Sequence, residues 1–142
     1  MIEAIFSNPY NVLGAVLLAS FAGFITWRNN RANRVAIASD AFRAAFADAL
    51  LRLTASREAT SIIIFQNHNG HLAAIIAFRP YVAWYRRCSF ERAGKEYSLQ
   101  ANIQKAKGPI EALAFDFTSE AQEQRAALLA SVQKLLSHAS AT

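Results

Sequence analysis

The pattern of apolar and polar positions divides the chain near residue 28. Residues 9–27 contain no charged side chain, and the remainder of the chain is far more polar. A helix rises about 1.5 Å per residue, so this run spans roughly the 30 Å hydrocarbon core of a bilayer. Backbone amides find no partner in hydrocarbon, and a lone apolar run can therefore cross only as a helix. The pattern predicts one transmembrane helix over residues 9–27.

Aromatic and basic residues mark the ends of this helix. Tyr10 and Trp27 bracket the run, where amphipathic rings anchor in the two headgroup layers. Residues 1–8 carry no Lys or Arg, whereas the other side opens with the membrane-interface arginines Arg28, Arg31 and Arg34. The positive-inside bias therefore predicts a single-pass protein of the inner membrane, with its N-terminus out and its C-terminus in the cytoplasm.

The run allows two other interpretations. A cleaved signal peptide has a basic segment before its apolar core, but here the preceding segment is acidic and the arginines follow. A buried helix of a soluble protein would tolerate Asn11, Ser20 and Thr26, but the arginines directly after Trp27 favour a membrane.

The segment after the arginines has the spacing of an amphipathic helix. No proline or glycine interrupts residues 28–56, and one apolar stripe lies along it at Phe42, Phe46, Ala49, Leu50 and Leu53. Such a stripe is typical of the core face of a bundle helix. Asp48 and Arg52 lie off the stripe at a spacing that suits an ion pair.

Residues 61–78 fit two structures. Their β-branched start and the Asn69-Gly70 pair suit a hairpin, which would make the fold α+β. A helix is the other interpretation, because one helical face can hold Ile62, Phe65, Leu72, Ala73 and Ile76. A lone hairpin is also marginal without a third strand, so we expect a helix.

Proline then separates this segment from an aromatic helix. Arg79-Pro80 reads as a corner, since proline is unfavourable inside a helix. From Tyr81 to about Gln100 a wide apolar face is predicted at Tyr81, Trp84, Tyr85, Cys88, Phe90, Ala93 and Tyr97. Cys88 is therefore expected to be buried rather than reactive.

The last helix has a capping pattern at its start. Ser119 and Gln122 form a capping-box pair, and the helix is expected to end near His138, which we expect to be solvated. Its buried face is predicted at Ala121, Leu128, Val132, Leu135 and Leu136.

The predicted fold is therefore all-α: one N-terminal transmembrane helix continues into a small cytoplasmic antiparallel helical bundle. Its parts are a short N-terminus (1–8), the membrane helix (9–27), the cytoplasmic domain (28–138) and a flexible tail (139–142).

The positive charge is concentrated in two segments. The net charge is +5, and the excess lies in residues 28–46 and 79–97. Both segments could rest against anionic headgroups. They show no nucleic-acid-binding motif, so nucleic acid is not an expected partner. The single cysteine excludes an intramolecular disulfide.

Three patterns resemble a loose group of small, single-span bacterial membrane proteins of unknown function. They are Phe42-Arg43-Ala44-Ala45-Phe46-Ala47, His71-x-x-Ala74-x-x-x-Phe78-Arg79-Pro80-Tyr81 and Phe90-x-x-Ala93-x-x-Glu96-Tyr97. The resemblance supports a helix in the middle segment and implies no activity.

Catalytic or metal-binding chemistry is not expected. His68 and His71 could offer two imidazoles, but two neutral ligands are too few for a zinc site. Nucleophile elbows, phosphate loops and metalloprotease motifs are absent from the sequence. We therefore predict a protein that is not an enzyme and has no metal or cofactor.

The expected function is a non-enzymatic, membrane-anchored interaction or scaffolding module. Its partners would be the lipid bilayer and an unidentified protein, and its candidate partner surface is Trp84, Arg86 and Arg87. The alternative is a membrane-active protein of toxin or lysis type that acts through oligomerisation of its transmembrane helix. Small residues at Ala15, Ala19 and Gly23 are the candidate helix–helix packing face for such a homo-oligomer.

Overall fold

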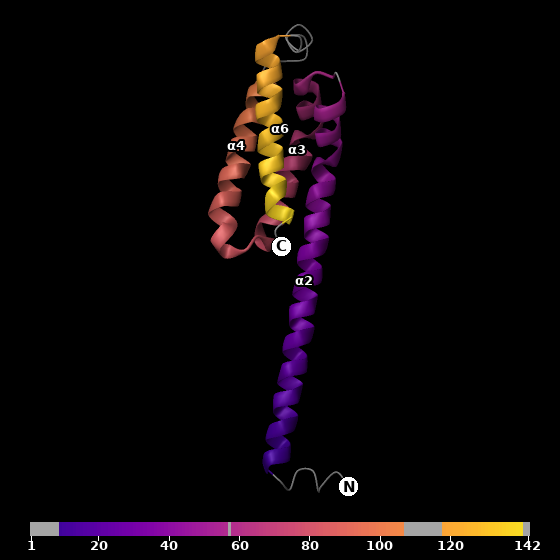
Figure 1. Cartoon of the computed structure of the whole chain (residues 1–142), viewed down its shortest axis with the longest axis vertical. Coiled ribbons are helices and arrows are strands. Elements are labelled where there is room, and N and C mark those ends of the chain that lie inside the picture. Colours follow the sequence, from indigo (N-terminus) through magenta and orange to yellow (C-terminus); the bar gives the residue numbers. More distant parts are fainter. Residues whose placement is uncertain (1–8, 57, 107–117, 141–142) are drawn as a thin grey trace. The chain divides into compact units, whose positions relative to one another are not determined.

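The computed structural model describes residues 9–56, 58–106 and 118–140 and is helical throughout (Figure 1). Its elements are α2 (Pro9–Ala55), α3 (Thr60–Phe78), the 3₁₀ turns η1 (Arg79–Tyr81) and η2 (Trp84–Arg86), α4 (Arg87–Ala106) and α6 (Ser119–Ser140). No strand occurs in these residues, so the all-α prediction is confirmed and the hairpin alternative for residues 61–78 is wrong.

The chain divides into two units, Met1–Ala36 and Ile37–Thr142. The first contains the apolar part of α2. The second is the helical bundle, in which the rest of α2 packs with α3, α4 and α6 (Figure 1). Residues 1–8, 107–117 and 141–142 lie outside the described residues, whereas the first two residues of the predicted tail 139–142 belong to α6.

The bundle core is rich in aromatic rings contributed by three helices. Phe42 of α2 stacks on Phe78 of α3 with ring centroids 4.6 Å apart, and its edge contacts Phe90 of α4. The predicted stripe of α2 forms this core: Phe42, Phe46, Ala49 and Leu53 are buried. Leu128, Val132 and Leu135 of α6 are buried as well. The periodicity therefore identified the core faces of α2 and α6 correctly.

Helix α3 turns a different face inward from the one that the sequence suggested. Phe65 and Ile76 are 70% and 72% exposed, whereas Ile63, Ile64 and His71 are buried. The segment is apolar on nearly every side, so its pattern could not select between faces.

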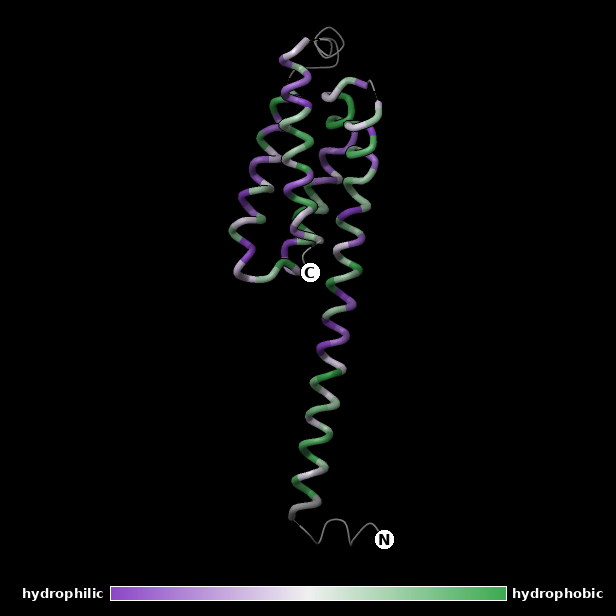
Figure 2. The backbone as a smooth tube through the Cα atoms, viewed as in Figure 1, coloured by the Kyte–Doolittle hydropathy of each residue, from purple (hydrophilic) through white to green (hydrophobic). Residues whose placement is uncertain are grey.

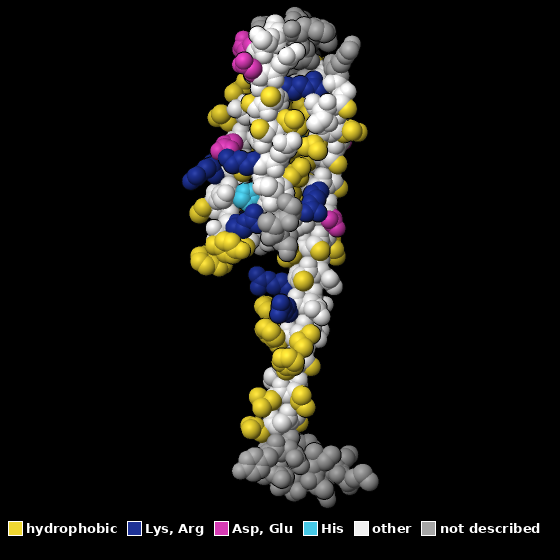
Figure 3. All heavy atoms as spheres, viewed as in Figure 1, with side chains coloured by type: hydrophobic (Ala, Val, Ile, Leu, Met, Phe, Trp, Pro, Cys, Tyr) yellow, Lys and Arg dark blue, Asp and Glu magenta, His cyan; other side chains and the backbone are white. Residues whose placement is uncertain are grey.

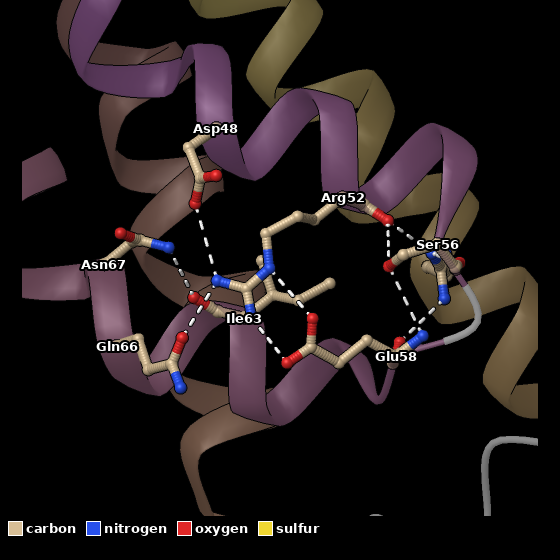
Figure 4. A network of polar contacts seen from close by, with 8 residues as sticks. Asp48, Arg52, Ser56, Glu58, Ile63, Gln66 and Asn67 are labelled. Carbon is tan, nitrogen blue, oxygen red and sulfur yellow. Dashed lines mark hydrogen bonds and ion pairs between the residues drawn. The ribbon is translucent and has the colours of Figure 1, made fainter.

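Arg52 holds the end of α2 against the start of α3 through several polar contacts (Figure 4). Its guanidinium forms an ion pair with Glu58, and its Nη1 donates to Gln66 Oε1 at 2.9 Å. The predicted Asp48–Arg52 pair is present at 3.4 Å. These contacts hold α2 and α3 together across the short connection between them.

Arg125 of α6 donates hydrogen bonds to carbonyl groups at the end of α2 and in the connection to α3. Its Nε donates to the carbonyl of Leu53 at 2.9 Å, and its Nη2 donates to those of Arg52 at 2.8 Å and Ser56. Its Nη1 donates to the carbonyl of Glu58 at 3.0 Å. The last carbonyls of a helix have no partner within the helix and carry partial negative charge, so a guanidinium here is favoured.

The start and end of α6 differ from the prediction. Thr118, not Ser119, caps the helix: its Oγ1 accepts from the N–H of Ala121 at 3.2 Å. The helix continues to Ser140, and His138 is buried with its ring edge against Phe90. The expectation that His138 is solvated is wrong, because the final turn of α6 packs on the core.

We predict that Arg125→Met lowers the free energy of unfolding by about 2–4 kcal/mol, because the carbonyls of Leu53, Ser56 and Glu58 lose their guanidinium donor. Urea unfolding of the full chain in detergent, followed by circular dichroism, measures the loss. Arg92→Met, at an exposed site of α4, is the matched control and should change the free energy by less than about 0.5 kcal/mol. Equal effects of the two variants would contradict the role of Arg125.

Candidate membrane segment and interaction surface

The first unit exposes a long apolar helical surface. Its large side chains Leu13, Val16, Leu17, Leu18, Phe21, Phe24 and Ile25 are all exposed. The same stretch appears as an unbroken apolar run followed by polar residues in Figure 2. None of the most apolar 18-residue window is buried, and the helix is long and apolar enough to cross a membrane. An apolar surface of this size without a cover in the described chain is typical of a region that contacts a membrane or another protein.

Trp27 lies where the apolar run meets its arginines. The guanidinium of Arg31 lies over the Trp27 ring, 5.7 Å from its centroid, and Phe24 packs against the same ring at 6.2 Å. Arg28 and Arg34 are exposed nearby in the sequence. The predicted anchor at this end therefore has the composition of a membrane interface, whereas the side chain of Tyr10 lies outside the described part.

The small residues of the apolar run lie on open helix surface. Ala15, Ala19 and Gly23 are exposed, and a Cβ atom added to Gly23 would have no neighbour within 4 Å. Self-association through this face stays a prediction.

Residues 79–87, which we call the corner, connect α3 to α4. Two short 3₁₀ turns flank Val82, whose side chain is buried in the core. The N–H of Val82 donates to the carbonyl of Arg79 at 3.3 Å, and Nε of Arg87 donates to the carbonyl of Val82 at 3.2 Å. Arg79 also pairs with Glu91 of α4 at 2.6 Å. The corner is thus tied to the bundle on both sides of Val82.

Trp84 and Tyr85 of the corner point away from the core, and Tyr81 is partly covered. Trp84 is 80% exposed, Tyr85 70% and Tyr81 38%, and the Trp84 and Tyr85 rings meet edge to face at 6.0 Å. The predicted aromatic core face is therefore wrong for these residues. The helix begins at Arg87 rather than Tyr81, and burying Val82 turns its neighbours outward.

Cys88 follows the corner in the first turn of α4 and is exposed, so its predicted burial is also wrong. The later part of the predicted face is correct: Phe90, Ala93 and Tyr97 are buried. Cys88 lies two residues before the buried Phe90 in α4, and therefore on nearly the opposite side of that helix.

The candidate partner residues stand together on the corner. Trp84 and Arg87 are exposed, and Arg86 is half-buried close enough to His138 to lower the pKa of that imidazole, after the larger effect of burial. Figure 3 shows apolar and basic side chains adjoining at this end of the bundle. The role of these residues as a partner surface stays a prediction.

The corner lies at the end of the bundle where the chain enters. Tyr81 lines a small hollow of about 220 Å³ together with Ala38, Phe42 and Phe78. Ala38 is the second residue of the bundle unit, which begins at Ile37. Ile37 is itself exposed.

A buried polar pair occupies the middle of the bundle. The ring of His71 stacks on Phe46 with centroids 4.3 Å apart, and its Nδ1 shares a hydrogen bond with the hydroxyl of Tyr97. Both side chains are fully buried. Neither periodicity nor spacing in the sequence indicated this pairing between α3 and α4.

Burial keeps this pair uncharged. It lowers the pKa of His71 from 6.5 to about 4, outweighing the Ala45 carbonyl and the Asp48 carboxylate, which favour the charged form. Burial also raises the pKa of Tyr97. His68 is buried one helical turn earlier, and its pKa is likewise lowered, first by burial and then by Lys105. A neutral, hydrogen-bonded histidine in an aromatic core is a structural element.

Other candidate chemistry is sparse in the described chain. No group of three metal-ligating side chains occurs among these residues. An open groove of about 480 Å³ runs between α3 and α4, lined by residues that include Ile75, Ile76, Glu91 and Leu99.

No known protein family, no curated protein and no solved structure matches the chain. The resemblance to small single-span membrane proteins therefore stays a prediction, and function has to be argued from the residues.

We predict that acid destabilises the bundle through His71. Below pH 6.5 the unfolded chain binds a proton that the folded chain does not bind until about pH 4, so stability falls as the pH falls through this interval. The free energy of unfolding should drop by about 2 kcal/mol more in the native chain than in His71→Gln between neutral pH and pH ~4.5.

Urea titrations at several pH values measure this difference. Tyr97→Phe, which keeps the imidazole, is the control and should retain the steep pH dependence. Parallel pH profiles for the native chain and His71→Gln would contradict the assignment.

Proposed function

We propose that the protein is a non-enzymatic, membrane-anchored interaction module. Residues 9–27 cross the inner membrane once, with the N-terminus outside, and the bundle stands in the cytoplasm. The corner is the surface through which the bundle meets its partner. The proposal rests on one observation: an uncovered apolar helix continues into the bundle, and the bundle exposes Trp84 and Tyr85 beside arginines at the end where this helix enters.

Energetic arguments support the anchor. The exposed Leu, Val, Phe and Ile side chains each gain about 1.5–3 kcal/mol when they leave water, and the described chain supplies no cover for them. Arg28, Arg31 and Arg34 oppose translocation of their end of the helix, which supports a cytoplasmic bundle. Cys88 is exposed and free, as expected in a reducing compartment.

The corner has the composition of an interaction surface. Aromatic residues and arginine are enriched at interface centres, because they bury large areas and offer several hydrogen bonds. Exposing a tryptophan by 80% has no benefit for an isolated bundle. The anchoring of Val82 and the Arg79–Glu91 pair hold these side chains in one arrangement before binding, which lowers the entropy lost on contact.

Cys88 provides a direct test of orientation. A membrane-impermeant maleimide added to intact cells should leave Cys88 unlabelled, and it should label the thiol once the membrane is opened. A cysteine placed at Ser7 in a Cys88→Ser chain is the matched control and should be labelled in intact cells. Labelling of Cys88 from outside would overturn the proposed orientation.

Cysteine footprinting tests the corner as an interaction surface. In a Cys88→Ser chain, Tyr85→Cys should react at least about fivefold more slowly in opened native membranes than in purified protein, because a partner covers it. Ala127→Cys is the control: it is exposed on α6, near the end that Arg125 ties to α2, and should react equally in both states. Equal reactivity of Tyr85→Cys in both preparations would show that the corner is uncovered.

A further inference from the structure

We propose that the partner of the corner is the anionic headgroup layer of the membrane that holds residues 9–27. The inference rests on the proposed function and names the partner of that surface. It makes the corner a second membrane contact, which sets how the bundle stands on the bilayer.

Charge and ring chemistry favour a lipid surface. Residues 79–92 contain four arginines and one glutamate. The same segment contains three exposed aromatic rings. Tryptophan and tyrosine settle at the boundary between headgroups and acyl chains, and guanidinium groups bind phosphate. Each basic side chain near an anionic leaflet increases surface binding about fivefold.

The internal bonding of the corner gives its rings a common direction. Val82 is inserted in the core, and Arg87 donates to its carbonyl, so the backbone at Trp84 and Tyr85 is held at the surface. Arg79 pairs with Glu91, the one acidic residue among the four arginines of residues 79–92, so this segment carries a net positive charge. This arrangement places apolar rings and positive charge on the same surface, as a headgroup layer requires.

Chain connectivity brings this surface to lipid. Tyr81 and Ala38 line the same hollow, so the corner lies at the end of the bundle that is joined to the membrane segment. Only a short stretch separates Trp27 from Ile37. Tethering makes the contact intramolecular, so even a weak affinity for headgroups is sufficient for occupancy. A protein partner would gain no such advantage from this position.

The two tryptophans, Trp27 and Trp84, allow a test with the full chain. The Trp27→Phe chain reports on Trp84, and the Trp84→Phe chain reports on Trp27. Each is reconstituted in vesicles of phosphatidylcholine with brominated acyl chains, with or without phosphatidylglycerol. Emission wavelength and bromine quenching are measured at low and high salt, after circular dichroism has shown that the helical content is unchanged.

We expect Trp27 to be quenched in both lipids. Trp84 should shift to shorter wavelength and be quenched only in vesicles with phosphatidylglycerol, and salt should reverse the change. Arg86→Glu with Arg87→Glu should reduce the bound population at least about 30-fold. The control is Lys95→Glu with Lys105→Glu, which reverses two positive charges at positions of α4 outside the corner. It should have a much smaller effect.

The outcomes separate the two proposals. Quenching of Trp27 without any response of Trp84 overturns the lipid contact, leaves the anchor standing and assigns the corner to a protein partner. An equal response of Trp84 in both lipids overturns the role of charge. Failure of lipid to quench Trp27 overturns the membrane anchor itself.

Discussion

The structure depends on a change of hydrophobic pattern within one helix. Up to Trp27, α2 is apolar on every side and nothing in the described chain covers it. Beyond Ile37 the apolar residues form one stripe, and that stripe becomes the bundle core with Phe42 and Phe46 at its centre. The first pattern suits an apolar environment such as lipid, and the second suits packing against other helices. The proposed anchor and the observed bundle both follow from this difference.

The bundle is held together by aromatic packing and by polar groups that close its ends. Phe42, Phe78 and Phe90 interlock across three helices, and His71 extends the stack as a neutral ring bonded to Tyr97. At one end Arg125 satisfies the carbonyls that terminate α2. At the other end burial of Val82 shapes the corner. The exposed surface proposed to bind membrane is thus a consequence of how the chain closes the core.

Sequence periodicity predicted the fold where one face of a helix is clearly more apolar than the others. It identified the stripe of α2 and the core face of α6, and the proline at residue 80 correctly marked a break. It could not choose the buried face of α3, where Phe65 and Ile76 are exposed although they are strongly apolar. Tertiary packing decides such a case, because the neighbouring helices determine which of several apolar faces of α3 is buried.

The candidate site shows the same limit. The composition of residues 79–97 indicates an aromatic, arginine-rich surface. The spacing of its apolar residues predicts one continuous helix with Cys88 buried, whereas Cys88 is exposed. Two 3₁₀ turns interrupt the helix on either side of Val82, whose burial no spacing rule reveals. His71 and His138 are buried for a related reason. Histidine is polar, so the sequence alone suggests exposure to water, but aromatic neighbours pack against each imidazole in the core.

The central claim is that residues 9–27 reside in lipid, and alkaline carbonate extraction of native membranes tests it most directly. The account predicts that the intact chain stays in the membrane pellet. A chain carrying Leu17→Arg and Phe21→Arg should be released, because each arginine at the centre of a span costs about 2.5–3.5 kcal/mol. Release of the unaltered chain into the carbonate supernatant would contradict the account.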